Sequence, residues 1–298
     1  KWISGWIKEH QALKVNEFPA NNLVVNKQKA IIYNNGKPKA KTILTVPIGT
    51  KLRGKQINEY QYKIILPHKN EFGIIDKEDV YCVSPQIDLS QSLIEETRKT
   101  LQRNLVTCAT SFCGGRYLKN GRSGFFPIPQ TAKYWGSDAA GLINLIYRTV
   151  GLHIPRTAQE QYLLSNKISS GKNLNVGDLI FWADIKTPKK IEHVTLLSDK
   201  TKNKSFVIDS TPKKKIELCS DLGKFGRKIQ KLKSGNVIGN KIIYLGSYLN
   251  SPELIYYLRN EALRNDYPQF RDIFLTTTNK TLPKNSKLTR VKKNRPVK

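Results

Sequence analysis

Residues 135–143 read WGSDAAGLI, and this stretch decides how the second half of the chain is expected to fold. Ser137 or Asp138 is suited to cap a helix, because a short oxygen-bearing side chain accepts hydrogen bonds from first-turn amides. Apolar residues then recur every three to four positions, until Gly151 stops the pattern. We therefore expect a helix from Asp138 to Val150. Its buried face would consist of Leu142, Ile143, Ile146 and Val150.

The elements around this helix indicate an α+β domain. The apolar spacing of residues 93–112 predicts an earlier helix, which Gly114 and Gly115 end. Short β-branched and apolar runs after Gly177 predict strands at 179–182, 193–197, 205–208 and 242–245. Helices followed by a sheet are typical of the α+β class.

Residues 20–81 form a region of a different kind, because their pattern is all-β. Short strands are expected at 29–33, 42–46, 60–64 and 72–76, with a turn at 47–50 (PIGT). Such spacing is typical of a small barrel. Residues 82–96 would be a linker, and residues 251–298 a C-terminal extension that ends in a solvated basic tail.

The composition limits the classes of partner. The chain has 298 residues and a net charge of +28, which fits a protein that works on an anionic polymer or surface. Nucleic acid and a bacterial envelope are both candidates, and a generally lysine-rich proteome is the plainer explanation. No nucleic-acid motif is present, so we expect no nucleic-acid partner. No apolar run is long enough to span a membrane.

The cysteines and methionines give little further direction. Cys82, Cys108, Cys113 and Cys219 show neither a CxxC pair nor zinc-type spacing, so we expect buried free thiols, no metal and no cofactor. A disulfide is the less favoured alternative. Methionine is absent, which means either an unusual composition or residues missing from the sequence, and in the second case some spacings are short by one.

Four blocks in the second half resemble those of the NlpC-type cysteine peptidases of bacterial cell wall. They are 135–143 (WGSDAAGLI), 152–157 (LHIPRT), 177–182 (GDLIFW) and 192–194 (EHV). The resemblance implies a papain-like α+β domain over residues 97–250. The family carries Asp-Cys-Ser-Gly or Asp-Cys-Ala-Gly in the first block, and this chain has Ala139 at the position of that nucleophilic cysteine.

Residue 139 falls in the first turn of the expected helix, where unpaired amides and the helix dipole lower the pKa of a thiol. Alanine leaves such a fold nearly unchanged and removes the reactive atom. A deliberate substitution and a natural loss of the cysteine both fit the sequence, and we favour the first.

His193 is the expected general base. His10 and His68 lie outside the expected domain, and His153 matches a variable position of the family. His193 opens a strand, as the family's base does, although a surface histidine is the plainer alternative. The resemblance places the orienting residue at the end of the next strand, where this chain has Asp209 instead of the usual His, Asn or Gln. An Asx-turn is the alternative reading of Asp209.

The resemblance also suggests substrate contacts. Tyr117 matches the tyrosine that lines the family's oxyanion site, and Asp138 is a candidate for binding the amine of the substrate. An aromatic and proline-rich insert at 124–129 would either wall the cleft or pack on the surface. Arg156 and Gln161 match a family run that we interpret as structural.

The all-β region resembles a bacterial SH3-like domain, with PIGT at 47–50 and Gly73 in its closing strand. Residues 1–19 are then either the end of a second, upstream barrel or a leader segment. This arrangement is similar to that of γ-D-glutamyl-L-diamino acid endopeptidases, whose barrel helps to select stems with a free N-terminal L-Ala. Asp76 or Glu78 would pair with that amine by charge.

These features predict a multidomain peptidoglycan stem-peptide hydrolase that uses Cys/His catalysis and is inactive with Ala139. The alternative is a natural pseudoenzyme that binds wall peptides without cleavage. Peptidoglycan or muropeptides would be the partners of a monomer in the cell envelope, or in the cytoplasm if it acts in muropeptide recycling.

Overall fold

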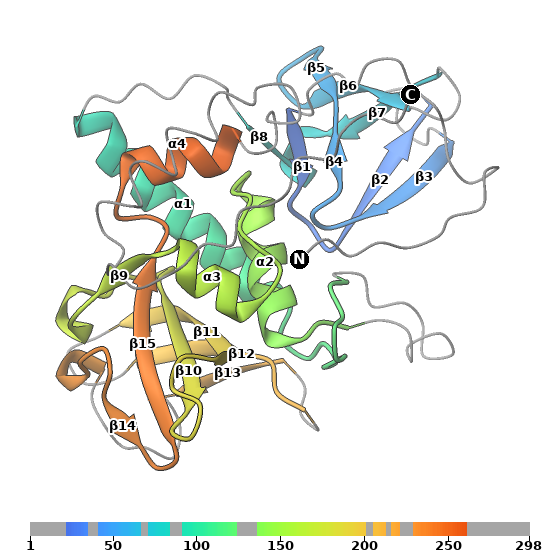
Figure 1. Ribbon diagram of the computed structural model, residues 1–298. Helices are drawn as coiled ribbons and strands as arrows, with labels where there is room; N and C mark the ends of the chain where they lie inside the picture. The colour runs from blue at the N-terminus through green and yellow to red at the C-terminus, as the bar shows by residue number, and fades with distance from the viewer. Residues whose placement is uncertain are drawn as a thin grey trace, which may run out of the picture. The chain divides into compact units, whose positions relative to one another are not determined.

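The computed structural model describes residues 22–34, 41–66, 71–83, 91–123, 136–200, 205–212, 216–220 and 229–260 (Figure 1). The predicted leader or barrel end at 1–19, the insert at 124–129 and the basic tail at 279–298 lie outside these residues.

Residues 22–83, called the N-terminal module below, consist of short strands in two sheets. One sheet has the order β4-β1-β8 and the other β3-β2-β7-β6-β5. The strands are β1 (Leu23–Val25), β2 (Lys29–Tyr33), β3 (Thr42–Pro47), β4 (Lys51–Leu52), β5 (Gly54–Gln56), β6 (Gln61–Leu66), β7 (Glu71–Asp76) and β8 (Val80–Cys82), and the 3-10 helix η2 (Lys77–Asp79) precedes β8.

The two sheets of the module share one hydrophobic core. Leu23 and Val80 from the smaller sheet pack with Ile32, Ile64 and Ile75 from the larger one. Neither sheet closes on itself among the described residues, so the predicted barrel is not confirmed, although the predicted strands are present. β4 has two residues and β8 three, which is too short to continue a ladder around a closed barrel.

The first long helix, α1 (Gln91–Ser111), buries Leu101, Leu105 and Cys108. Its predicted C-terminal end is confirmed. Its start is earlier than predicted, so the linker expected at 82–96 does not extend beyond residue 90. The apolar spacing begins at Leu93, but the helix starts two polar residues earlier, at Gln91.

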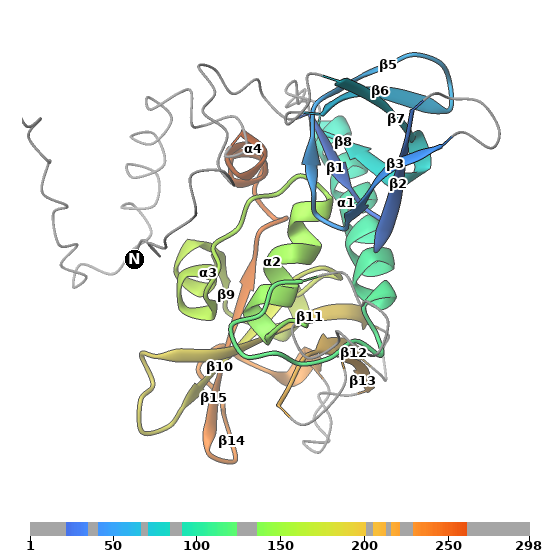
Figure 2. The same ribbon diagram turned by 90° about the vertical axis from the view of Figure 1, so that its right-hand side faces the viewer.

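The second half of the chain contains a third sheet, which is antiparallel and has the order β13-β12-β11-β10-β15-β14, with β9 paired to β15. The strands are β9 (Asn166–Ile168), β10 (Leu179–Asp184), β11 (Ile191–Lys200), β12 (Ser205–Asp209), β13 (Glu217–Ser220), β14 (Val237–Ile238) and β15 (Lys241–Ser247), with the 3-10 helices η4 (Gly171–Asn173) and η6 (Ile229–Lys231). Helices α2 (Ala139–Thr149) and α3 (Ala158–Leu164) both contact β11 (Figure 2).

The packing of the central strand β10 explains why its sequence is apolar. Ile180 and Trp182 belong to a core that also contains Leu197 and Ile243 from the neighbouring strands. The alternate residue Phe181 packs its ring against Tyr162 of α3, with centroids 5.3 Å apart. Because both faces are covered, β10 is apolar at nearly every position instead of alternating.

A last helix, α4 (Pro252–Asn260), continues the packed part of the chain past residue 250, where we had placed the end of the domain. Its Leu258 is buried, and the carbonyl of Leu258 accepts a hydrogen bond from the backbone N–H of His153 at 3.0 Å. Arg259 donates to the hydroxyl of Tyr81 in β8 at 2.5 Å. Helix α4 therefore contacts both the segment after α2, at His153, and the N-terminal module, at Tyr81.

The N-terminal module also contacts α2 directly. Gly49 has a φ of +77° in the turn before β4, and a Cβ atom there would lie 2.7 Å from Cδ1 of Leu145. Glycine is therefore required at this position both by the left-handed backbone and by the close approach of the helix.

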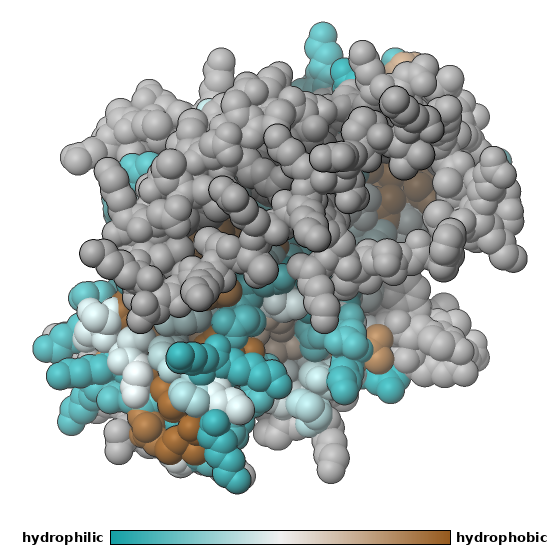
Figure 3. All heavy atoms as spheres, viewed as in Figure 1, coloured by the Kyte–Doolittle hydropathy of each residue, from teal (hydrophilic) through white to brown (hydrophobic). Residues whose placement is uncertain are grey.

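The surface is mostly hydrophilic, and the cysteines differ in exposure. In Figure 3, hydrophilic side chains predominate among the coloured atoms in the lower part of the view, with some hydrophobic ones between them. Ile185 and Val237 are among the exposed hydrophobic residues. No described helix is long and apolar enough to cross a membrane. Cys82, Cys108 and Cys113 are free thiols, but only Cys108 is buried, so burial was predicted wrongly for the other two.

Candidate functional site

The position expected for the nucleophile lies at the start of α2, where Asp138 caps the helix. Oδ1 of Asp138 accepts from the backbone N–H of Gly141 at 2.6 Å. Arg156 donates to both carboxylate oxygens, each at 2.9 Å. Ala139 follows directly and is 7% exposed. A cap and a bidentate ion pair thus fix the first turn that presents residue 139.

Asp138 is therefore already bound at both oxygens. Its side chain is 18% exposed, and that of Arg156 is 25% exposed. A substrate amine would have to compete with Arg156 and with the helix amide for this carboxylate. Its contacts make Asp138 a positioning residue for α2, and binding of a substrate amine stays a prediction.

His193 and Asp209 form a hydrogen-bonded pair. His193 lies near the start of β11, and Asp209 is the last residue of the neighbouring antiparallel strand β12. Nε2 of His193 is 2.7 Å from Oδ1 of Asp209, and the side chains are 28% and 20% exposed. A carboxylate at Nε2 orients the ring, favours the proton on that nitrogen and leaves Nδ1 as the basic atom.

The end of β12 is joined to the start of α2 by a buried hydrogen bond. Ser210 follows Asp209, and its Oγ donates to the backbone carbonyl of Ser137 at 2.8 Å. Ser137 is two residues before Ala139. The bond thus joins the segment that contains Asp209 to the segment that contains the predicted nucleophile position.

Tyr117 lies beside the segment that contains Ser137. The backbone N–H of Ser137 donates to the carbonyl of Arg116 at 3.1 Å, and that of Leu118 donates to the carbonyl of Ser137 at 3.4 Å. Tyr117, between them, is half-buried. The structure therefore pairs His193 with Asp209, and it brings the residues next to Tyr117 and Asp209 into contact with Ser137, two residues before Ala139.

Gln161 explains how α3 supports this arrangement. Its side-chain Nε2 donates to the backbone carbonyls of Ala140 and Pro155, each at 2.9 Å, and the backbone carbonyl of Gln161 accepts from the hydroxyl of Tyr248 at 2.6 Å. The side chain is fully buried. The contacts of Gln161 fit the structural role that we inferred from the sequence.

His153 is an unsuitable base. Burial, together with the nearby cations Lys51, Arg148 and Arg122, lowers the pKa of His153 to about 3. A nitrogen that binds a proton only in strong acid is a poor general base near neutral pH. This environment agrees with choosing His193 over His153.

The carboxylates proposed for amine capture on the N-terminal module make other contacts. Glu78 pairs with Lys27 at 2.8 Å, and it lines a pocket of about 600 Å³ together with Thr149 and Val150 at the C-terminal end of α2. Oδ1 of Asp76 accepts from Gln61 at 3.2 Å. Glu78 is thus placed toward the end of α2 opposite to Ala139.

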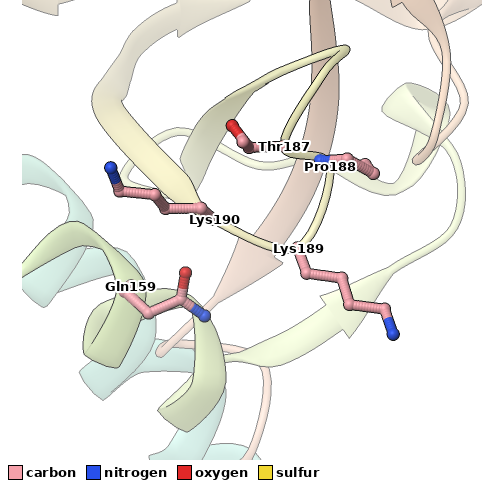
Figure 4. Close-up of a pocket in the computed structure, with 5 residues that line it drawn as sticks. All are labelled: Gln159, Thr187, Pro188, Lys189 and Lys190. Atoms are coloured by element: carbon pink, nitrogen blue, oxygen red, sulfur yellow. The ribbon is translucent and has the colours of Figure 1, made fainter.

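Sequence reasoning missed two contributors. Ser210 was noted only as the neighbour of Asp209, and nothing local indicates its bond to Ser137 across 73 positions. Gln159 of α3 accepts from the backbone N–H of Ile191 at 2.7 Å and thereby anchors the β10–β11 hairpin two residues before His193. A hollow of about 560 Å³ lies there, lined by Gln159 and residues 187–190 (Figure 4).

Among the described residues, no group of three His, Cys, Asp or Glu side chains is placed to hold a metal ion. What the site offers chemically is a helix N-terminus, an imidazole held by a carboxylate, and a neighbouring tyrosine. The sequence predicts these as the parts of a cysteine-type acyl-transfer site with alanine at the nucleophile position, and their roles stay predictions.

Residues 117–229 match the model of the NlpC/P60 family. The chain therefore contains an NlpC/P60 domain, as the resemblance predicted, and this family consists of cysteine peptidases. The match includes Tyr117, Ala139, His193 and Asp209, and it does not include the N-terminal module, whose SH3-like character is not confirmed.

Two curated proteins are similar to parts of this chain. The gamma-D-glutamyl-L-lysine dipeptidyl-peptidase of Bacillus cereus is 27% identical over 197 residues, which is 64% of this chain and 53% of that protein. The bifunctional muramidase/DL-endopeptidase CwlT of Bacillus subtilis is 41% identical over 59 residues, which is 20% of this chain and 18% of that protein. The chain thus spans about half, or less, of the length of these curated relatives.

A solved structure supports the fold. The crystal structure of an NlpC/P60 family protein from Bacillus cereus matches the fold of this chain with a TM-score of 0.51 and 22% identity. The match covers 77% of this chain and 64% of that one.

Proposed function

We propose that this chain, with cysteine at position 139, hydrolyses the amide between γ-D-glutamate and the diamino acid of peptidoglycan stem peptides. The observation that carries the proposal is the 2.7 Å bond between Nε2 of His193 and Oδ1 of Asp209, tethered through Ser210 to the start of α2. The NlpC/P60 domain gives the reaction class. The printed name of the Bacillus cereus relative suggests the γ-D-glutamyl bond.

In the cysteine form, the N-terminus of α2 would lower the pKa of the thiol, and Nδ1 of His193 would accept its proton. The thiolate attacks the γ-carbonyl carbon, and His193 returns the proton to the departing amine. Water then hydrolyses the thioester, again with His193 as the base. Asp209 holds the ring and stabilises the imidazolium, and Tyr117 lines the side of the cleft next to Ser137.

Ala139 has no atom that can carry out the attack. The chain as given is therefore proposed to bind wall peptides without cleaving them, whether the alanine is a deliberate substitution or a natural loss. Because only a sulfur is missing, the walls of the cleft would keep their shape. We propose the cell envelope as the place of action, or the cytoplasm if recycled muropeptides are the substrate, and a monomer as the acting form.

The N-terminal module is proposed to be SH3-like and to contribute to substrate recognition. Its two sheets share a single core and it docks on α2 through Gly49. Asp76 stays a candidate for capture of the L-Ala amine, and it is better suited than Glu78, which Lys27 already pairs. Calorimetry with free and N-acetylated L-Ala-γ-D-Glu-diaminopimelate tests this, since equal affinities would rule out amine capture.

The proposal is tested by Ala139→Cys. Purified protein is incubated with L-Ala-γ-D-Glu-diaminopimelate, and free diaminopimelate is measured by mass spectrometry. We expect turnover in the cysteine form and none in the alanine form. In the cysteine background, His193→Ala should abolish turnover, whereas Cys108→Ser and Cys113→Ser should not.

A cysteine form that is folded and yet inert would refute the enzymatic function. Loss of turnover in Cys113→Ser at unchanged thermal stability would instead identify a different sulfur as the nucleophile. If the alanine form is also the natural one and binds the peptide, the pseudoenzyme alternative holds.

A further inference from the structure

A single guanidinium, that of Arg156, connects the start of α2 to the loop before it. Its Nη1 and Nη2 donate to the two carboxylate oxygens of Asp138, each at 2.9 Å. Nη2 also donates to the backbone carbonyl of Gly121 at 2.9 Å. Gly121 belongs to residues 116–123, which contain Tyr117 and are called the Tyr117 loop below. Arg156 therefore holds both the residue that caps α2 and this loop.

The Tyr117 loop lies close against the first turn of α2. The carbonyl of Gly121 also accepts from the backbone N–H of Asp138, at 3.2 Å. A Cβ atom at Gly141 would overlap this carbonyl oxygen, and one at Gly121 would overlap the carbonyl oxygen of Gly136. Glycine is needed at both positions because backbone packs directly on backbone. Arg156 thus binds a carbonyl oxygen that has little freedom to move.

Asn144 of α2 holds the segment that contains Arg156. Its Nδ2 donates to the backbone carbonyls of Ile154 at 2.6 Å and Pro155 at 3.2 Å. Its Oδ1 accepts from Nη1 of Arg122, a residue of the Tyr117 loop, at 3.1 Å. Asn144 is itself buried. The loop and the segment before Arg156 are therefore tied to α2 at a second point.

Asp138 directly precedes the predicted nucleophile position, so its charge bears on a thiol there. A carboxylate next to a thiol favours the protonated, unreactive form. The helix nevertheless needs this carboxylate, because Oδ1 of Asp138 accepts from the N–H of Gly141 at 2.6 Å. Its side chain is only 18% exposed, so water screens the charge weakly. The fork of Arg156 balances the charge that the cap introduces.

We propose that Arg156 makes position 139 suitable for a thiolate, because its charge balances Asp138 and its fork fixes the Tyr117 loop. The inference rests on the proposed function, which gives position 139 its role, and it adds an electrostatic role to the structural one that the sequence suggests for Arg156. Arg156 acts through Asp138 and Gly121, so it is a positioning residue. Lysine would supply the charge without the fork.

The first test measures the pKa of a thiol at position 139 in the Ala139→Cys chain. The rate of alkylation by iodoacetamide is followed from about pH 5 to about pH 10. Mass spectrometry of the peptide that contains position 139 separates this thiol from the four other cysteines. Arg156→Gln should raise the thiol pKa by about one unit, because Asp138 is then unbalanced. The matched control is Arg103→Gln, an exposed arginine of α1 that contacts Thr100, and it should leave the thiol pKa unchanged.

A charge rescue separates this role from a purely structural one. Asp138→Asn removes the carboxylate and keeps the cap, so adding it to Arg156→Gln should return the thiol pKa to the parent value. A purely structural role predicts a lower Tm and no such return. If Arg156→Gln does not fold, Asp138→Asn alone decides, because it leaves Arg156 unbalanced and should lower the thiol pKa below that of the parent. The other charged groups of the region are the same in all these variants: Arg122, His193 and Asp209.

The second test separates the fork from the charge. Arg156→Lys keeps a cation beside Asp138, so the thiol pKa should stay close to that of the parent. The bonds to both carboxylate oxygens and to Gly121 cannot all be kept, so amide hydrogen exchange in residues 116–123 should become faster. Exchange in α1, which Arg156 does not contact, is the internal reference.

An unchanged thiol pKa in both Arg156→Gln and Asp138→Asn would overturn the electrostatic role. Unchanged hydrogen exchange of the Tyr117 loop in Arg156→Lys would overturn the role of the fork. Neither readout uses a peptide substrate. Failure of the proposed function would therefore be seen separately, as an Ala139→Cys chain that is inert on stem peptides although its thiol responds to Arg156 as expected.

Discussion

At the N-terminal end of α2, one carboxylate, Asp138, is held by one guanidinium and one helix amide, with both oxygens used. At the C-terminal end, Arg148 and Arg122 lie together with no carboxylate among the described residues to pair them. The N-terminal end of α2, where the charge of Asp138 is balanced, is called the neutralised end below. The C-terminal end, where the described residues offer no carboxylate to Arg122 and Arg148, is called the uncompensated end. Fixed geometry at residue 139 is what a nucleophile needs, whereas the uncompensated cations act on the pKa of His153.

The largest effect is expected at the neutralised end, from Asp209→Ala in the Ala139→Cys form. Without the carboxylate, the His193 ring loses both its orientation and the group that stabilises its charge. We expect kcat to fall roughly 10³–10⁴-fold, which is about 4–5 kcal/mol of barrier. Steady-state kinetics on the stem tripeptide measure this fall. Asp199→Ala, in the neighbouring strand β11, is the control, and an unchanged kcat in Asp209→Ala would remove Asp209 from the mechanism.

The second effect concerns stability at the same end. Asp138→Ala removes the cap of α2 and leaves Arg156 partly buried without its partner. We expect a loss of about 3 kcal/mol in the free energy of unfolding, measured with urea. Asp138→Asn keeps the cap and should lose less. The exposed pair between Lys27 and Glu78 serves as the contrast, since Glu78→Ala should leave the urea midpoint in place. Equal midpoints for Asp138→Ala and the parent would show that the ion pair does not hold α2.

The smallest effect is expected at the uncompensated end, as a dependence on pH. The pKa of His153 is about 3 in the folded state against 6.5 in the unfolded chain, so the unfolded state binds more protons between these values. Stability from this group is complete above pH 6.5 and is lost as the pH falls toward 3. Because solvent reaches part of the ring, we expect a loss of about 2 kcal/mol.

His153→Gln should remove this part of the acid sensitivity. Chemical unfolding in chloride buffers without phosphate, at steps between pH 7 and 4, measures the slope. His193→Gln is the matched control, because it makes the same replacement at a second histidine of the same part of the chain. Identical slopes for the parent and His153→Gln would mean that burial and the neighbouring cations do not hold His153 neutral.

The two ends also differ in what the sequence could reveal. The cap at Asp138 and the stop at Gly151 act over three or four residues, and for this reason α2 was predicted to within one residue at each end. Strands β10, β11, β12 and β15 were likewise predicted from their apolar runs. The ion pair with Arg156 spans 18 positions and has no local signal.

The rest depends on contacts between distant segments. The cations that act on His153 at the other end of α2 come from residues 51, 122 and 148, so no single stretch of sequence shows them together. Neither the split of the N-terminal strands into two sheets nor the helix α4 was predicted, because each is set by what it packs against. The candidate residues Ala139, His193 and Asp209 came from spacing between blocks, and their roles stay proposals.

Helix α4 has a bearing on how this protein can be cut into parts. The boundary that sequence suggests, after residue 250, falls between β15 and α4. Removing everything beyond it would take away the carbonyl of Leu258 that binds the loop at His153, and the guanidinium of Arg259 that binds Tyr81. A single deletion would thus remove the helix that contacts two regions far apart along the chain. The minimal autonomous folding unit of the catalytic region is therefore expected to extend to residue 260.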